Sequence, residues 1–210
     1  MRKLGVTTAL ALAASATLVL GQQARPASPR GSAEAVVGGQ YVKTERGQRY
    51  EGGKWIEIDY SRPILRGRAN VFGEGAEYGK ALYAGAPVWR AGADKSTRLK
   101  TEVPLEIGGK TVPPGEYSLF VELKSPTEWT LIVSSHAAQD RFSRDEKVAL
   151  WGAYNYTPDK DVARAPMTTE QIPFSVDQLT WGFSDVTNQG GTMRLYWEKT
   201  MASVPFKVAS

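Results

Sequence analysis

The stretch GEYSLFVELKSPTEWTLIVS, residues 115–134, carries the pattern that decides the fold. Apolar side chains recur at every second position from Tyr117 to Leu123 and again from Trp129 to Val133, and a short polar turn separates the two runs. A period of two places alternate side chains on opposite faces of an extended strand. Two such runs joined by a tight turn predict a pair of antiparallel strands.

The same alternation recurs along the chain. It is found in four further runs, residues 103–107, 179–183, 193–197 and 204–208. Turn-forming Gly, Pro, Ser and Asn residues separate the runs, at 108–109, 113–115, 125–127 and 187–191. Only residues 135–150 have a composition that permits one or two helical turns. The sequence therefore predicts an all-β fold, an antiparallel β-sandwich, with a closed β-barrel as the alternative.

The first 21 residues have the organisation of a secretory signal peptide. Arg2 and Lys3 precede an uncharged run that is shorter and less apolar than the about 20 residues of a membrane anchor. Residues 22–39 are rich in Ala, Gly, Ser, Pro and Gln, which predicts a flexible linker. We therefore expect a signal peptide over 1–21, a linker over 22–39 and a single domain over 40–210. This organisation predicts a periplasmic or secreted protein with no membrane span in the mature chain.

The charge distribution argues against a nucleic-acid partner. The 210 residues carry 26 Lys and Arg and 22 Asp and Glu, a formal net charge of +4. Residues 1–50 hold seven basic and two acidic side chains, so the remaining 160 residues have a net charge of −1. The predicted domain thus has no bulk attraction for phosphate backbones or anionic membranes.

Catalytic and metal-binding motifs are missing from the sequence. The chain has no cysteine and a single histidine, His136, which excludes disulfides, a cysteine nucleophile, thiolate metal sites and multi-histidine sites. The patterns GxSxG, SxxK and HExxH do not occur, so no catalytic residue is identified. We expect no metal and no cofactor, and we interpret His136 as a structural or surface residue.

The densest polar cluster is VWRAGADKST, residues 88–97. Its Arg90, Asp94 and Thr97 stand beside small residues, so the backbone can turn tightly and the guanidinium can pair with a carboxylate or with a ligand oxygen. An alternative interpretation is that Arg90 and Asp94 form a buried pair that fixes the turn after Trp89.

Aromatic residues provide a second indication of a binding site. The chain has six Trp and nine Tyr, and Trp89, Trp151 and Tyr154 lie in or beside predicted loops, where rings can stack on sugars or peptides. Three other tryptophans fall on the apolar phase of predicted strands and are expected in the core, namely Trp129, Trp181 and Trp197.

A set of short motifs resembles the signature of an exported bacterial family catalogued as a domain of unknown function. The motifs are YSRP, GR, VWRAGAD, PPGEYSL, WGAY and WEKT, at residues 60–63, 67–68, 88–94, 113–119, 151–154 and 197–200. The resemblance covers roughly residues 57–208 and implies an exported, single-domain, mostly β protein, with no established reaction, substrate or cofactor. Asp94 stands where the family usually has asparagine, and residues 73–87 are longer than the family pattern.

These observations favour an exported binding protein over an enzyme. The candidate binding residues are Tyr60, Arg62, Arg68, Trp89, Arg90, Asp94, Thr97, Trp151 and Tyr154. The arginines would bind anionic or hydroxyl-bearing groups and the aromatic rings would stack. The expected partner is a small molecule, a glycan or an envelope protein.

Two other functions remain open at the level of sequence. One is a cell-envelope hydrolase in which Asp94, Glu74 or Glu77 acts as general base. This hydrolase needs a second acid or a metal nearby, and a sequence does not show which side chains meet in space. The other is a structural component of the envelope or matrix, for which exposed strand edges and a flexible linker would suffice.

Overall fold

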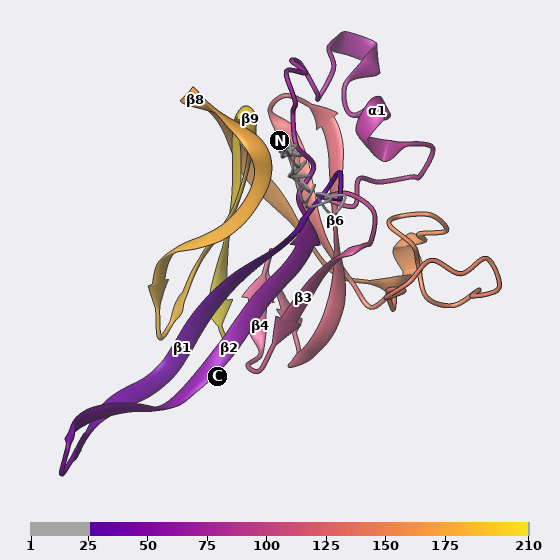
Figure 1. The fold of residues 1–210 in the computed structure, drawn as a ribbon. Coiled ribbons are helices and arrows are strands. Elements are labelled where there is room, and N and C mark those ends of the chain that lie inside the picture. The colour runs from indigo at the N-terminus through magenta and orange to yellow at the C-terminus, as the bar shows by residue number, and fades with distance from the viewer. Residues whose placement is uncertain (1–25, 210) are drawn as a thin grey trace, which may run out of the picture.

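The computed structural model describes residues 26–209 and shows one nine-stranded antiparallel sheet (Figure 1). The strand order in the sheet is β1-β2-β3-β6-β7-β8-β9-β4-β5. The strands are β1 (Arg30–Thr44), β2 (Gly47–Ser61), β3 (Thr97–Thr101), β4 (Leu105–Ile107), β5 (Lys110–Val112), β6 (Gly115–Ser125), β7 (Glu128–Ser134), β8 (Asp161–Thr187) and β9 (Gly190–Val208). The all-β sandwich prediction is confirmed. Because β1 and β5 remain open edges, the closed barrel is wrong.

Helical structure is sparse in the described part of the chain. It consists of one α-helical turn, α1 (Lys80–Tyr83), and two 3-10 turns, Gly75–Glu77 and Pro158–Lys160. Residues 135–150, expected to allow a helical turn, form an irregular loop instead. Within residues 26–209, no helix has the length and apolar character that a membrane crossing requires.

The sheet folds over along β8 into two layers (Figure 1). Residues 161–167 of β8 pair with β7, and residues 168–187 pair with β9. The register shifts between Gln171 and Val176, a stretch that contains Pro173. Proline cannot donate a ladder hydrogen bond, and such irregularities bend a strand. The bend allows β9, β4 and β5 to pack against β1, β2, β3, β6 and β7.

Large aromatic side chains fill the space between the layers. Phe72, Trp89, Trp129 and Trp197 are buried, and their contacting ring centroids lie 5.0 to 6.3 Å apart. Trp181 is also buried, so the prediction that Trp129, Trp181 and Trp197 belong to the core is confirmed.

The outer face of β6 and β7 is covered as well. Phe120 and Ile132 are fully buried there beneath residues 86–88 and 150–156. The ring of Phe120 packs edge-on against Tyr156, with centroids 5.1 Å apart. The loop between β7 and β8 is therefore held against the sheet by a second apolar cluster, which fixes the position of the residues it carries.

The expectation of a linker is wrong for residues 30–39, which form the first ten residues of β1. This segment pairs with β2 in a register that runs from Arg30 opposite Ser61 to Gly38 opposite Gly53. Ala35 and Val37 are buried. The alanines at 33 and 35 lie opposite Ile58 and Ile56 of β2, which supply the larger buried side chains. The predicted signal peptide, residues 1–21, lies outside the described residues.

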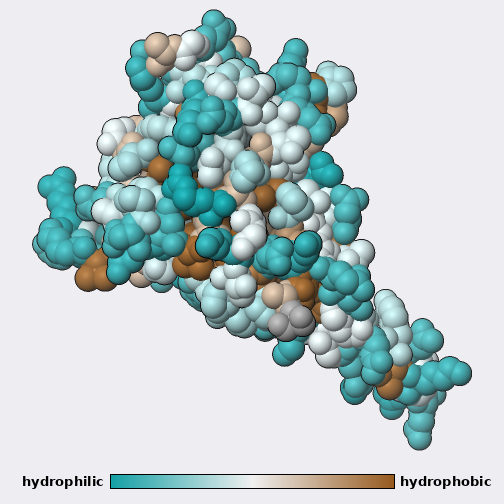
Figure 2. Space-filling view, turned by 180° about the vertical axis from the view of Figure 1, so that it is seen from behind, coloured by the Kyte–Doolittle hydropathy of each residue, from teal (hydrophilic) through white to brown (hydrophobic). Residues whose placement is uncertain are grey.

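The far half of the β1–β2 hairpin leaves the body of the molecule as an arm (Figure 1). The arm begins after Gly38 and Gly39, whose φ angles of 70° and 71° lie in the left-handed region that favours glycine. Its side chains are mostly exposed, and its surface is largely hydrophilic (Figure 2). Tyr41 and Tyr50 pack edge-on across the two strands, with ring centroids 5.2 Å apart.

Candidate functional site

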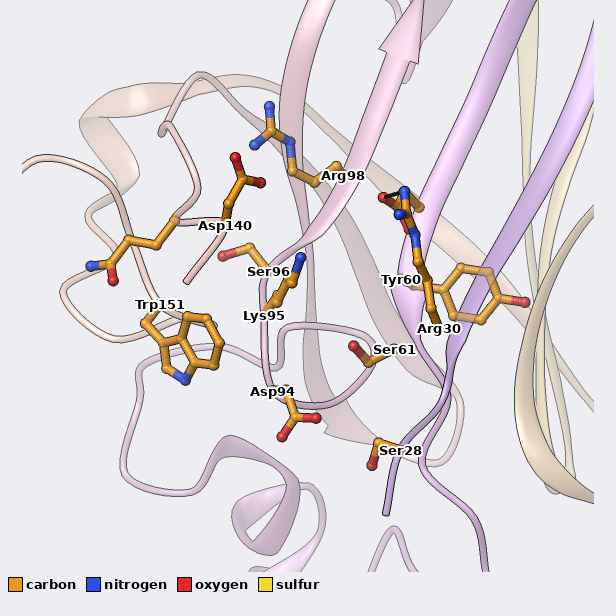
Figure 3. A pocket seen from close by; sticks show the side chains of 12 residues that line it. Ser28, Arg30, Tyr60, Ser61, Asp94, Lys95, Ser96, Arg98, Asp140 and Trp151 are labelled. Atoms are coloured by element: carbon orange, nitrogen blue, oxygen red, sulfur yellow. Dashed lines mark hydrogen bonds and ion pairs between the residues drawn. The ribbon is translucent and has the colours of Figure 1, made fainter. Parts of the chain in front are cut away.

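A pocket of about 370 Å³ lies where four segments meet (Figure 3). The segments are the start of β1, the end of β2, the approach to β3, and the loop between β7 and β8. The lining residues are Ser28, Arg30, Asp59, Tyr60, Ser61, Asp94, Lys95, Ser96, Arg98, Gln139, Asp140 and Trp151. We call this cavity the Trp151 pocket.

The wall before β3 is held by hydrogen bonds to its backbone. The Ala91 carbonyl accepts from the Thr97 hydroxyl at 3.2 Å and from the Trp181 indole N–H at 2.9 Å. The Ala93 N–H donates to the Ser61 carbonyl, and a Cβ added to Gly92 would lie 2.9 Å from that same oxygen. Glycine at this position therefore permits the chain to approach β2 closely.

The opposite wall is held by Gln139, which is buried. Its side-chain amide donates to the Ala149 carbonyl at 2.9 Å, and its side-chain oxygen accepts from the Ser143 N–H at 2.8 Å. The hydroxyl of Ser96 donates to the Gly152 carbonyl. These bonds fix Trp151 and Asp140 at the rim of the pocket although both lie on an irregular loop.

Arg90 makes contacts within the protein and does not line the pocket. Its Nη1 donates to the backbone carbonyl of Asp94 at 2.7 Å, and its guanidinium lies 5.4 Å from the centre of the Tyr154 ring. The alternative of a buried Arg90–Asp94 ion pair is thus wrong, because the contact is made to the carbonyl and Asp94 is exposed. The carboxylate of Asp94 is left to face the pocket (Figure 3).

Charges in the Trp151 pocket balance, with three cationic and three acidic residues in the lining. Arg30 forms a two-point ion pair with Asp59, and the Asp59 carboxylate holds the pKa of Arg30 above its ordinary value. Arg98 pairs with Glu116 on β6. Asp94, Lys95 and Asp140 have no side-chain hydrogen bond or ion pair to the described residues, which leaves these three charged ends available to a ligand.

A second cavity of about 480 Å³ adjoins the first and shares Gln139 and Trp151 with it. Phe142 and Tyr154 line this second cavity and are exposed. Phe142 packs edge-on against Trp151, with ring centroids 5.7 Å apart. The Trp151 indole therefore forms an aromatic ridge between two hollows.

Of the nine residues proposed from the sequence, three line the Trp151 pocket, namely Tyr60, Asp94 and Trp151. Tyr60 is nearly buried, and its ring points away from the other side chains in Figure 3. Its hydroxyl contacts the Trp181 carbonyl at 3.4 Å, and burial raises the pKa of that hydroxyl above its ordinary value.

The other predicted residues make contacts within the protein and do not line the Trp151 pocket. Arg62 donates to the Leu179 carbonyl at 3.3 Å, and Arg68 donates to the Ile64 carbonyl at 2.8 Å. Trp89 and Thr97 are buried, which makes them unsuitable for ligand contact. The remaining two, Arg90 and Tyr154, lie against each other next to the second cavity.

Most of the pocket lining lies outside the nine residues proposed from the sequence, including Arg30, Asp59, Arg98 and Asp140. Two short patterns carried a usable signal. In WIEIDYS, residues 55–61, Asp59 falls on the face opposite the two buried isoleucines. In TRLKT, residues 97–101, Arg98 likewise falls on the face opposite the buried Thr97 and Leu99. Arg30 and Asp140 carry no comparable signal, since only the tertiary fold brings them to this place.

Residues considered for catalysis lie mostly elsewhere. His136 Nε2 accepts a hydrogen bond from the Thr157 backbone N–H at 3.1 Å. The ring therefore links the start of the β7–β8 loop to its end. Glu74 accepts a hydrogen bond from the Asn70 side-chain amide at 2.9 Å. Glu77, on the exposed turn before α1, forms an ion pair with Lys80, the first residue of α1. Within residues 26–209, no group of three or more His, Cys, Asp or Glu side chains is placed to hold a metal ion.

The pocket walls coincide with the motifs quoted above, since YSRP, VWRAGAD and WGAY meet around it. The family described as "Protein of unknown function (DUF2911)" matches residues 43–206. The chain belongs to this family. The DUF2911 match contains the pocket residues from β2 onward, whereas Ser28 and Arg30 precede it. Comparisons with curated proteins and with solved structures found no match.

Proposed function

We propose that this protein is an exported cell-envelope protein that binds a glycan in the Trp151 pocket. One observation carries the proposal: Asp94, Lys95 and Asp140, whose charged ends are unpaired within the described residues, line the same pocket as a partly exposed indole (Figure 3). A sugar ring offers an apolar face that stacks on an aromatic side chain. Its hydroxyl groups both donate and accept, so they can bond to carboxylates and to an ammonium group at once.

The charge of the pocket supports an uncharged ligand. Three cationic and three acidic side chains leave no net charge to attract a phosphate or a polyanion. The wall is also preorganised, because Gln139 and Ser96 already hold the loop that carries Trp151. The location in the envelope rests on the signal-peptide pattern of residues 1–21.

Isothermal titration calorimetry tests this function. Protein lacking residues 1–21 is titrated with neutral and cell-wall-derived oligosaccharides, alongside Trp151→Ala and Asp94→Asn. We expect each substitution to weaken binding about tenfold, a loss of about 1.4 kcal/mol. Phe174→Ala is the matched control, because Phe174 is an exposed aromatic residue on β8 that lines neither cavity. Wild-type protein that binds no oligosaccharide would contradict the proposal.

A hydrolase is the second candidate, favoured by one observation. Asp94 and Asp140 line the same pocket without a side-chain partner among the described residues, as a pair of carboxylates for sugar hydrolysis would. Chromatography of the oligosaccharides after prolonged incubation separates the two functions. Intact oligosaccharides support a binding protein, and cleavage that Asp94→Asn abolishes supports the hydrolase.

A further inference from the structure

A third hollow of about 360 Å³ lies on the outer face of β2, β3 and β6. Its lining residues are Trp55, Glu57, Lys100, Thr101, Glu102, Gly115 and Glu116. Trp55 is 50% exposed although it lies on a regular strand. Its two neighbours on the inner face, Ile56 and Ile58, are fully buried, so the strand faces are well defined and the indole points outward.

This hollow continues the Trp151 pocket along the sheet. Asp59 lies opposite Arg98 in the β2–β3 register, and both line the Trp151 pocket. Glu57 lies opposite Lys100 two residues further along, and both line the hollow beside Trp55. The two cavities are therefore lined by successive cross-strand pairs on the same face of the sheet.

Glu116 on β6 forms the boundary between the two cavities. Its carboxylate pairs with Arg98 on one side and lies 3.6 Å from the Lys100 Nζ on the other. Surface ion pairs of this kind contribute little to stability, so a ligand hydroxyl can share or replace one of them at small cost.

We propose that the ligand is a linear glycan that lies along β2 from Trp151 to Trp55, with a sugar stacked on each indole. Trp55 is four residues from Asp59, which corresponds to about 13 Å along a strand. A single sugar in the Trp151 pocket does not cover that distance, whereas a chain of several sugars does. This inference rests on the proposed function and adds the length of the ligand to it.

The charges beside Trp55 define the glycan further. The hollow contains three glutamates and one lysine, so its net charge is −2. A polyanionic glycan is repelled there, while neutral and amino-bearing sugars are accepted. The ligand class is thus a neutral or amino-bearing linear glycan.

Affinity as a function of chain length tests the inference. Wild-type protein, Trp55→Ala and Trp151→Ala are titrated with cello- and chito-oligosaccharides, from the disaccharide to the hexasaccharide. In the wild type we expect the Kd to fall at least tenfold from disaccharide to hexasaccharide. Trp55→Ala should remove that gain and leave disaccharide binding unchanged, whereas Trp151→Ala should weaken both. Tyr41→Ala, another exposed aromatic residue on the same hairpin, is the matched control and should behave as the wild type.

Each contrary result has its own meaning. If the wild type binds the disaccharide and the hexasaccharide equally and Trp55→Ala changes neither, the extended groove is wrong while the Trp151 pocket stands. If the wild type binds none of these glycans, the proposed function fails and the groove fails with it. Since Trp55 is half exposed, Trp55→Ala should keep the thermal midpoint of the wild type, which is measured on the same samples.

Discussion

The carboxylate of Glu198 holds the connection between β2 and α1 in place. Its two oxygens accept from the backbone N–H groups of Asn70 and Val71 at 2.6 and 3.2 Å. Hydrogen bonds to a charged acceptor are among the stronger ones, so we expect Glu198→Gln to lower the free energy of unfolding by about 1–3 kcal/mol in urea titrations. Glu77→Gln is the control, since its exposed pair with Lys80 should contribute less than about 1 kcal/mol. Equal losses in the two variants would contradict this assignment.

Tyr156 should make the protein less stable at alkaline pH. Burial and the hydrogen bond to Asp161 raise the pKa of its hydroxyl above the ordinary value. The unfolded chain releases this proton near pH 10, the ordinary tyrosine value, while the folded protein retains it. The stabilisation is therefore complete below about pH 10 and is lost as the pH rises further.

Urea midpoints measured from about pH 8 to 11 check this effect. Tyr156→Phe should decline less steeply than the wild type over the alkaline half of that range. Some decline should persist, because burial also raises the pKa values of Tyr60 and Tyr78. Identical slopes for variant and wild type would show that Tyr156 is not responsible.

At the scale of elements, β1 decides where the domain begins. Residues 30–39 pair with β2 and bury Ala35 and Val37. A chain that begins at Gln40 would lose these contacts and would leave residues 53–61 of β2 unpaired on the edge that faces β1. We expect it to unfold at markedly lower urea than a chain that begins at Ser28, or to be insoluble. Equal midpoints for the two chains would mean that residues 28–39 contribute nothing to the stability of the fold.

Periodicity predicts those strands in which apolar and polar side chains alternate without interruption over several residues. Residues 117–123 and 129–133 were recognised in this way and form parts of β6 and β7. The composition of 30–39 concealed β1, because its burial depends on the partner strand and not on its own side chains. The same limit applies to the covered outer face of β6, where Phe120 is buried by a loop distant in sequence.

The same limit applies to the candidate site: residues with a local sequence signal could be predicted, and residues placed there by long-range contacts could not. Asp94 and Trp151 could be singled out because small residues and loop aromatics are visible locally. Arg30 and Asp140 join them only through the β1–β2 register and the anchored loop. Arg90 resembles a ligand contact in the sequence, yet its guanidinium is committed to the Asp94 carbonyl and the Tyr154 ring.

At the scale of the whole molecule, Phe72 joins the two layers of the sandwich. Its ring centroid lies 5.0 Å from Trp129 on β7 and 5.8 Å from Trp197 on β9. We expect Phe72→Ala to lower the free energy of unfolding by about 3–5 kcal/mol, the usual cost of truncating a buried aromatic ring. Because the contact spans both layers, fluorescence and circular dichroism should still report one coincident transition. Separate transitions would mean that the layers unfold independently.

The central claim is that the Trp151 pocket is a binding site, and tryptophan fluorescence tests it most directly. Trp89, Trp129, Trp181 and Trp197 are buried, so ligand-induced changes report on the two accessible indoles, at positions 55 and 151. The emission maximum of the wild type and of Trp55→Phe should shift to shorter wavelength on titration with a disaccharide, and that of Trp151→Phe should not. A shift that persists in Trp151→Phe, or no shift in the wild type, would contradict the account.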